Sequence, residues 1–285
     1  MTEDPDDRDE APAPRRRMIF RPQVLPTMLT LGNLFCGFLA IAKAADAMAV
    51  PHGPVDPPPA EMLHLLNYAG WLIFLGMVFD ALDGSVARLA GGASALGNVL
   101  DSLADMITFG AAPAFLAKCI AEGVGGMGDR RMTLYFSVFF ACMAGLRLAR
   151  YSSQHGDPEE ANLWFQGLPT PGAAAVIAGL ALLVDDPIIR PGGVVLWLLP
   201  WATLVLGLLM VSRFPYTHIV NRFLKGRKPV HYLVVGMVAL VLALTFHFEA
   251  SLVGAVMLYA LSGPVVSLFR RRVGRGARVG AEGGP

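Results

Sequence analysis

Long apolar segments recur along the whole chain, and they constrain its fold more than any other feature. A helix needs about 20 apolar residues to cross the hydrocarbon core of a membrane. Charged residues make up 16% of the chain, below the roughly one quarter usual in soluble domains. We therefore predict an all-α fold, a polytopic membrane helix bundle with eight spans at residues 25–47, 63–90, 94–119, 132–151, 170–186, 194–212, 230–247 and 251–269.

The placement of lysine and arginine predicts the orientation of this bundle. Residues 213–229 and the C-terminal tail are rich in both, whereas residues 48–62 contain neither. Because basic loops stay on the cytoplasmic side, we expect both termini to be cytoplasmic. We divide the chain into a disordered cytoplasmic tail, a core of six membrane helices, two additional membrane helices and a basic cytoplasmic tail, at residues 1–17, 18–220, 221–270 and 271–285. The net charge of +1 indicates no nucleic-acid partner.

Four aspartates interrupt the second and third apolar segments: Asp80, Asp83, Asp101 and Asp105. Each charged side chain at the centre of a membrane helix costs about 2.5–3.5 kcal/mol on insertion scales. Residues three or four apart share a helix face, and the pair Gly91-Gly92 suits a tight turn between antiparallel helices. We therefore predict that the four carboxylates converge near the cytosolic rim and hold two divalent ions, Mg²⁺ or Mn²⁺, which prefer oxygen ligands.

Small and basic residues surround these acids. Gly84, Ala87 and Gly97 leave room for a nucleotide beside the helix backbone, and Arg88 offers a planar fork for phosphate. Each feature alone has a simpler explanation, as a helix-packing residue, an interfacial arginine or a cap. These explanations do not account for the whole pattern in two consecutive spans.

The spacing Asp80-x2-Asp83-Gly84-x2-Ala87-Arg88-x8-Gly97-x3-Asp101-x3-Asp105 resembles the signature of the CDP-alcohol phosphatidyltransferase family. The resemblance implies a CDP-linked lipid donor, release of CMP, a pair of divalent metal ions and a homodimer. It assigns all four aspartates to metal ligation and gives Asp105 the further role of general base. The CDP-lipid site that we expect contains Thr27, Thr30, Asn33, Asp83, Gly84, Ala87, Arg88, Ser94 and Gly97. Thr27 stands where the family pattern has asparagine.

Further stretches narrow the resemblance. Residues 26–37, 108–113, 146–151 and 165–171 are similar to segments of bacterial phosphatidylserine synthases. This similarity implies CDP-diacylglycerol as donor, L-serine as acceptor and residence in the cytoplasmic membrane with the site facing the cytoplasm. No serine, cysteine or histidine stands out as a nucleophile, which favours direct displacement over a covalent intermediate.

An acceptor with a carboxylate calls for a bidentate basic partner. Arg147 and Arg150, at the inner end of the fourth span, are candidates, with Gly167 and Pro169 shaping the serine pocket. Both arginines are equally explained as anchors at the membrane surface. Acceptors such as glycerol 3-phosphate or inositol phosphate stay open as alternatives, and so does a cation transporter that uses the acids as an ion path. A purely structural scaffold leaves the four acids unexplained.

Overall fold

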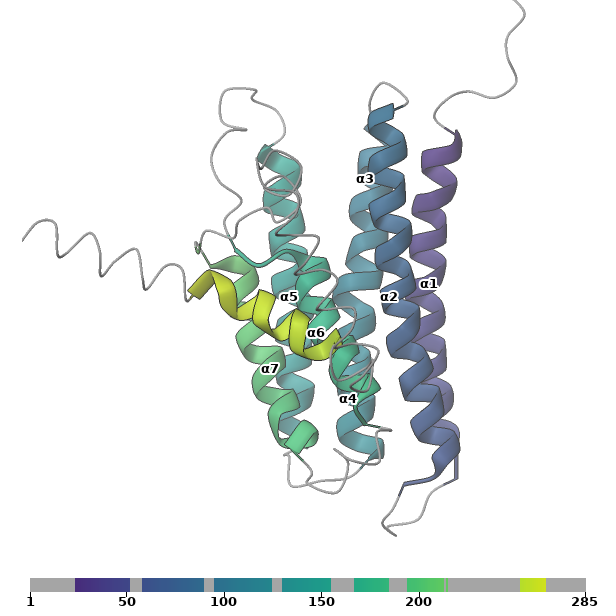
Figure 1. The fold of residues 1–285 in the computed structure, drawn as a ribbon, viewed down its shortest axis with the longest axis vertical. Coiled ribbons are helices and arrows are strands. Elements are labelled where there is room, and N and C mark those ends of the chain that lie inside the picture. The colour runs from purple at the N-terminus through teal and green to yellow at the C-terminus, as the bar shows by residue number, and fades with distance from the viewer. Residues whose placement is uncertain are drawn as a thin grey trace, which may run out of the picture.

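The computed structural model describes residues 24–51, 58–89, 95–124, 130–154, 167–184, 194–212, 214 and 252–264, and these contain helices and no strand. The labelled helices are α1 (Val24–Ala49), α2 (Ala60–Leu89), α3 (Ala95–Asp105), the π-helix η1 (Met106–Ala111), α4 (Ala112–Gly123), α5 (Arg130–Gln154), α6 (Thr170–Leu182) and α7 (Val194–Val211). An unlabelled helix, Leu252–Pro264, follows near the C-terminus. The all-α prediction is confirmed for this part of the chain (Figure 1).

Four described stretches are long and apolar enough to cross a membrane: Val24–Ala49, Ala60–Val86, Leu96–Gly123 and Arg130–Ser152. They coincide with the first four predicted spans. The predicted spans 170–186, 194–212 and 251–269 correspond to shorter apolar helices, and 230–247 lies outside the described residues. The count of eight spans and the orientation of the termini therefore stay predictions.

The third predicted span is one continuous rod made of three helical segments. Its middle turn, η1, has π geometry, with the Ala112 N–H donating to the Ile107 carbonyl. Pro113 explains the departure from α geometry, because it has no N–H and its ring clashes with the carbonyl four residues earlier. The π turn begins directly after Asp105, so it sets how the acidic helix continues below the aspartates.

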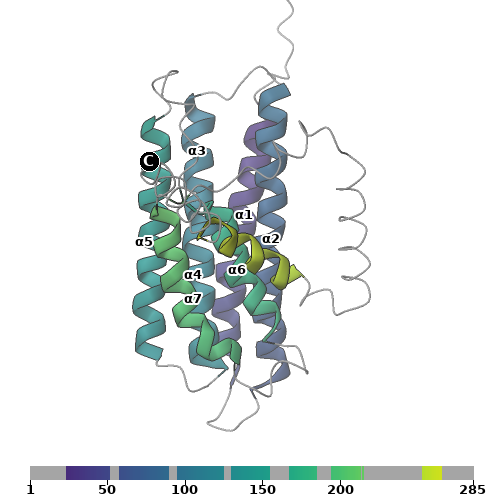
Figure 2. The ribbon, with the colours of Figure 1, turned by 60° about the vertical axis from the view of Figure 1, so that its left-hand side comes forward.

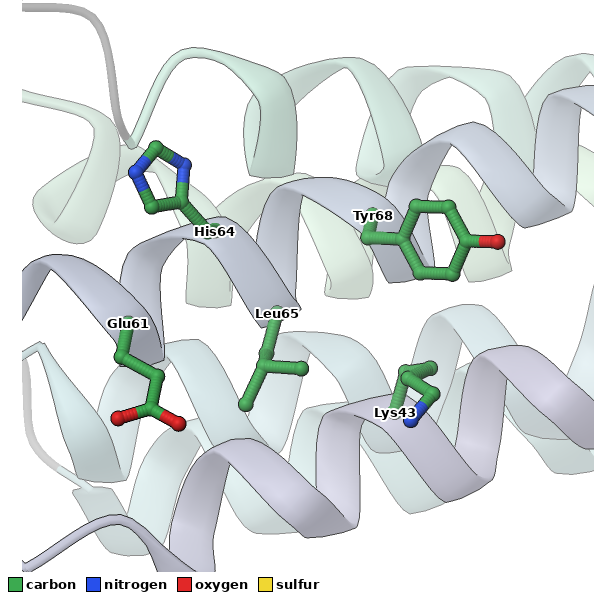
Figure 3. A pocket seen from close by; sticks show the side chains of 5 residues that line it. All are labelled: Lys43, Glu61, His64, Leu65 and Tyr68. Carbon is green, nitrogen blue, oxygen red and sulfur yellow. The ribbon is translucent and has the colours of Figure 1, made fainter.

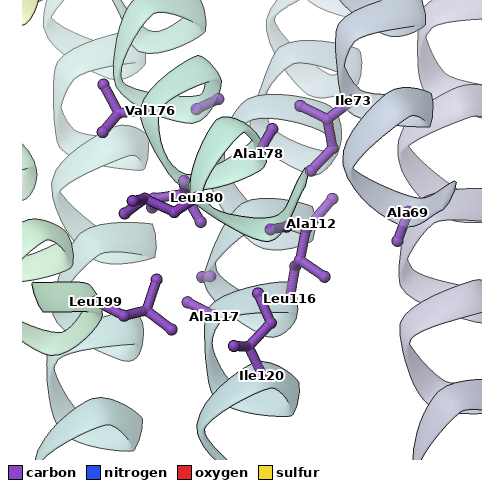
Figure 4. Close-up of a cluster of buried hydrophobic side chains, with 14 of the residues drawn as sticks. Ala69, Ile73, Ala112, Leu116, Ala117, Ile120, Val176, Ala178, Leu180 and Leu199 are labelled. Atoms are coloured by element: carbon purple, nitrogen blue, oxygen red, sulfur yellow. The ribbon is translucent and has the colours of Figure 1, made fainter. Parts of the chain in front are cut away.

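Helix α6 is the centre of the apolar core. Eleven of its 13 residues are buried, and at 1.5 Å per residue it covers only about 20 Å. Such a helix, apolar on all sides, packs inside a bundle rather than along its surface. Figure 4 shows its Val176, Ala178 and Leu180 among side chains of α2, α4 and α7.

The C-terminal helix Leu252–Pro264 crosses the other helices instead of running along them (Figures 1 and 2). It packs on α6 at two glycines. A Cβ atom on Gly179 would lie 2.9 Å from Val253 Cγ2, and one on Gly172 would lie 3.0 Å from Tyr259 Cε1. These glycines let the two helices approach closely.

Candidate active site

Two antiparallel helices bring three carboxylates together. Asp80 lies near the end of α2, and Asp101 and Asp105 lie in α3. One carboxylate oxygen from each falls within 4.8 Å of the others, and all three side chains are partly buried. The prediction that acids of both helices converge is thus met by these three residues. Helix α3 packs mainly on α1 rather than on α2, with α1 seen between them in Figure 2.

The fourth acid, Asp83, is held differently. Its side chain is only 5% exposed, and Thr30 of α1 donates a hydrogen bond to Asp83 Oδ2 at 2.9 Å. Asp83 lies outside the tight group of three, although it interacts electrostatically with Asp80, Asp101 and Asp105. We predicted that all four aspartates ligate metal, and the structure distinguishes Asp83 from the other three by its hydroxyl partner.

Asn33 supplies a second contact from α1 to the acids. Its Nδ2 donates to Asp105 Oδ1 at 3.1 Å, across 72 positions of sequence. Its backbone carbonyl accepts a hydrogen bond of 2.9 Å from Thr108 Oγ1 in η1. Sequence reasoning assigned Thr30 and Asn33 to the CDP-lipid, whereas in this structure their side chains orient the aspartates.

A divalent ion fits the donors that are present. The buried Asp101 Oδ1 has no hydrogen-bond partner among the described residues, and neither has Asn33 Oδ1. A buried oxygen that accepts nothing is costly, and crowded carboxylates repel one another. Oxygen donors in this arrangement suit a hard cation such as Mg²⁺ or Mn²⁺.

The other residues predicted for the CDP-lipid have mixed positions. Gly84 follows Asp83 in α2, Gly97 lies one turn before Asp101 in α3, and Thr27 lies one turn before Thr30 in α1. Ala87 and Arg88 belong to the last turn of α2, but their side chains are not among those described. Ser94 and the Gly91-Gly92 turn lie outside the described residues.

Replacing Thr30 with valine keeps the shape of the side chain and removes the hydroxyl that holds Asp83. We expect metal affinity, measured from the dependence of activity on Mg²⁺ concentration, to fall about 10-fold, since lost ligand-orienting bonds typically cost 10–100-fold. Thr203→Val is the matched control, because the Thr203 hydroxyl donates to the Pro200 carbonyl within its own helix, α7. Equal Mg²⁺ dependence in both variants would contradict an orienting role for Thr30.

Arg147 and Gly167, two of the residues predicted to bind serine, meet at the end of α7. Arg147 Nη1 donates to the Met210 carbonyl at 3.3 Å. The same carbonyl lies against Gly167, whose φ of +90° is readily available only to glycine. A Cβ there would also lie 2.8 Å from the Ser212 carbonyl. Pro169 follows as the N-cap of α6.

Arg150 behaves differently from Arg147. Arg150 is exposed and Arg147 is partly buried. The structure therefore groups Arg147, Gly167 and Pro169 around one helix end and leaves Arg150 on the surface one turn further along α5.

The end of α5 connects this region to the acids. Ser102, beside Asp101, and Ser152 of α5 have their hydroxyls 3.2 Å apart. Tyr151 interacts electrostatically with both Asp101 and Arg147. Sequence analysis did not select Tyr151 as a site residue, and its only signal was its place after the two arginines.

Sequence analysis also missed the role of Thr108. It is fully buried and donates to the Asn33 carbonyl. A Cβ on Gly76 would lie 2.6 Å from Thr108 Cγ2, and Gly37 presses on the same residue from α1. The available signal in the sequence was Thr108 itself, a polar residue in an apolar run, together with Gly37 and Gly76 in the two preceding spans.

A groove of about 630 Å³ lies between α1 and α2, away from the acids. Lys43, Glu61, His64, Leu65 and Tyr68 line it (Figure 3). Asp80 lies twelve positions after Tyr68 in α2, which corresponds to about 18 Å. Lys43 forms an exposed ion pair with Asp46 at 2.8 Å. The groove is thus separate from the carboxylate site.

Fold and site together define a class. The chain is a multi-pass helical membrane protein that holds clustered, partly buried carboxylates on two antiparallel helices. A family model described as CDP-alcohol phosphatidyltransferase matches residues 23–211, a segment that includes every residue of the acidic site. The chain belongs to the CDP-alcohol phosphatidyltransferase family.

Several relatives carry one name. A CDP-diacylglycerol–serine O-phosphatidyltransferase of Helicobacter pylori is 32% identical over 195 residues, which cover 68% of this chain and 71% of the relative. The protein of that name from Bacillus subtilis is 30% identical, over 68% of this chain and 90% of its own length. The one from Saccharomyces cerevisiae is 39% identical over 132 residues, covering 44% and 45% of the two chains.

Proposed function

We propose that this protein transfers the phosphatidyl group of CDP-diacylglycerol to the hydroxyl of L-serine, giving phosphatidylserine and CMP. The observation that carries the proposal is the convergence of Asp80, Asp101 and Asp105 within the segment that defines the family. The names of the relatives support serine as the acceptor over glycerol 3-phosphate or inositol phosphate. The convergence of acids beside a family signature also favours an enzyme over a cation transporter.

The carboxylates would hold two divalent ions, Mg²⁺ or Mn²⁺. Asp80, Asp101 and Asp105 are the ligands that lie closest together, and Asp83 would join them from its bond to Thr30. When bound, the two ions would neutralise the diphosphate and stabilise both the entering and the leaving oxygen. Gly84, Ala87, Arg88, Ser94 and Gly97, together with Thr27, complete the proposed CDP-lipid site.

Asp105 is the proposed general base. The Asn33 amide donates to Asp105 Oδ1, which fixes the carboxylate and leaves Oδ2 to accept a proton. The serine hydroxyl gives that proton to Asp105 as its oxygen forms a bond to the β-phosphorus. The bond from this phosphorus to the bridging oxygen breaks, and CMP leaves with the electron pair.

Arg147 is the proposed partner of the serine carboxylate. It is anchored on the Met210 carbonyl and is partly buried, so its guanidinium is held in place rather than free in water. Arg150, exposed on the next turn, fits an anchor at the membrane surface better.

Replacing Arg147 with lysine is expected to raise the KM for serine about 10-fold, because a lysine cannot form the bidentate pair. The KM for CDP-diacylglycerol should change little. Arg130→Lys, an exposed position at the far end of α5, is the control. An unchanged serine KM in Arg147→Lys would remove this residue from the acceptor site.

Orientation and assembly belong to the same proposal. We place the acids on the cytoplasmic side of the cell membrane, with both termini in the cytoplasm, because the basic segments 213–229 and 271–285 would then face inward. A homodimer is the proposed assembly.

The test is a reaction with purified protein, CDP-diacylglycerol, Mg²⁺ or Mn²⁺ and a panel of acceptors: serine, glycerol 3-phosphate and inositol phosphate. We expect CMP release only when serine is the acceptor, with phosphatidylserine as the lipid product. CMP release with a phosphorylated acceptor instead would replace serine by that acceptor. Ion flux into protein-containing vesicles without any CMP release would overturn the enzyme proposal altogether.

A further inference from the structure

Helix Leu252–Pro264 lies outside the segment that defines the family, which ends at residue 211. It nevertheless packs into the core, where Val253 and Ala260 are each 5% exposed. Its contacts on α6 fall on Gly172 and Gly179. A helix added after the family segment is therefore part of the packed structure beside the proposed acceptor site.

Tyr259 of this helix contacts α6 at its first turn, which follows the proposed acceptor segment. Its ring edge lies 3.0 Å from the position that a Cβ on Gly172 would occupy, and Leu168 Cδ1 lies 3.7 Å from the same position. Gly172 stands in the first turn of α6, directly after the Gly167–Pro169 segment. The aromatic ring of Tyr259 thus packs on the first turn of α6, just after the segment in which Gly167 contacts the end of α7.

Arg147 approaches the same place from α5. Its guanidinium donates to the Met210 carbonyl, which also contacts Gly167. Tyr259 and Arg147 are close enough to interact electrostatically. Tyr259 packs at Gly172, beside Leu168, and Arg147 is held by the carbonyl that contacts Gly167 at the start of the same segment.

We propose that Tyr259 is a positioning residue of the acceptor site: with the Met210 carbonyl, it holds Arg147 in the orientation that binds the carboxylate of the acceptor. The inference rests on the proposed function. It gives the helix Leu252–Pro264 a role in acceptor specificity, through a residue that the family segment does not contain.

Tyr259→Phe is the decisive variant, because it keeps the ring on Gly172 and removes only the hydroxyl. We expect the KM for serine to rise about fivefold, the size of effect expected for one polar contact. The KM for CDP-diacylglycerol, kcat and the melting temperature should stay as in the wild type. Leu258→Ala, on the same helix and 73% exposed, should leave all four quantities unchanged.

A double-mutant comparison separates positioning from packing. If Tyr259 acts through Arg147, Tyr259→Phe should have little further effect on serine KM in an Arg147→Lys background. An unchanged serine KM in Tyr259→Phe overturns the inference. So does a parallel change in both KM values and the melting temperature, which indicates a structural role. If the wild type releases no CMP with serine, the proposed function fails and this inference fails with it. If the wild type turns over normally and Tyr259→Phe has the same serine KM, only the inference is overturned.

Discussion

Replacing Asp105 with asparagine is expected to reduce CMP release by at least about 10³-fold, because a positioned general base contributes 10²–10⁴-fold and the variant also loses a carboxylate ligand. The amide keeps the size of the side chain and can still pair with Asn33, so the helices should pack as before. In the absence of divalent ions the melting temperature should rise, since one member of a crowded acidic group is gone. Mg²⁺ binding should raise the melting temperature of the wild type, and this rise should be smaller in Asp105→Asn.

The matched control for this variant is Asp46→Asn. Asp46 is an exposed aspartate of α1 whose partner is Lys43, at the groove far from the acids. Its replacement should leave CMP release and the response to Mg²⁺ unchanged. An Asp105→Asn protein that releases CMP at the wild-type rate would remove the general base from the mechanism. One that loses activity but keeps the full Mg²⁺ response would limit Asp105 to proton transfer.

Replacing Gly37 with alanine is expected to lower activity by about 100-fold, although Gly37 touches no substrate in the proposed mechanism. The new Cβ would lie 2.7 Å from the Thr108 Cα, a backbone atom that cannot rotate away. Helix η1 would have to move by roughly 1 Å, and shifts of that size near a reacting group cost about 10²-fold. Overpacking should also lower the free energy of unfolding by about 1–3 kcal/mol.

The chain offers a matched glycine as control. Gly254, in the helix Leu252–Pro264, has nothing within 4 Å of the position of an added Cβ. Gly254→Ala should be neutral or should stabilise the protein by up to about 1 kcal/mol, because alanine favours a helix. Thermal unfolding in detergent and initial rates of CMP release measure both effects. If Gly37→Ala behaves like Gly254→Ala, the contact between α1 and η1 does not position the site.

The spacing of the aspartates was enough to predict that acids of two helices meet. Side chains at positions three and four apart share a face, and a short connection forces neighbouring helices to run antiparallel. Asp80, Asp101 and Asp105 meet as this reasoning requires. The hydrogen bond that sets Asp83 apart could not be predicted, because its donor, Thr30, lies 53 positions away in the sequence.

Hydropathy located the helices, but it did not distinguish a helix that faces lipid from one that is buried in the bundle. Residues 170–186 were read as a membrane span because they are apolar, and the structure places a 13-residue helix there, buried on nearly all sides. An apolar helix satisfies lipid and a protein interior equally well, so hydropathy alone does not distinguish the two. The same holds for Leu252–Pro264, which lies across the bundle.

The sequence by itself determined that this is a helical membrane protein with an acidic site, because apolar length and the cost of a charge in lipid act locally along each segment. Only the tertiary structure decided which side chains support that site. Asn33 beside Asp105, Thr108 between Gly37 and Gly76, and Tyr259 near Arg147 are contacts between residues far apart in the chain. Their partners follow from how the helices pack, and packing depends on the whole set of helices at once.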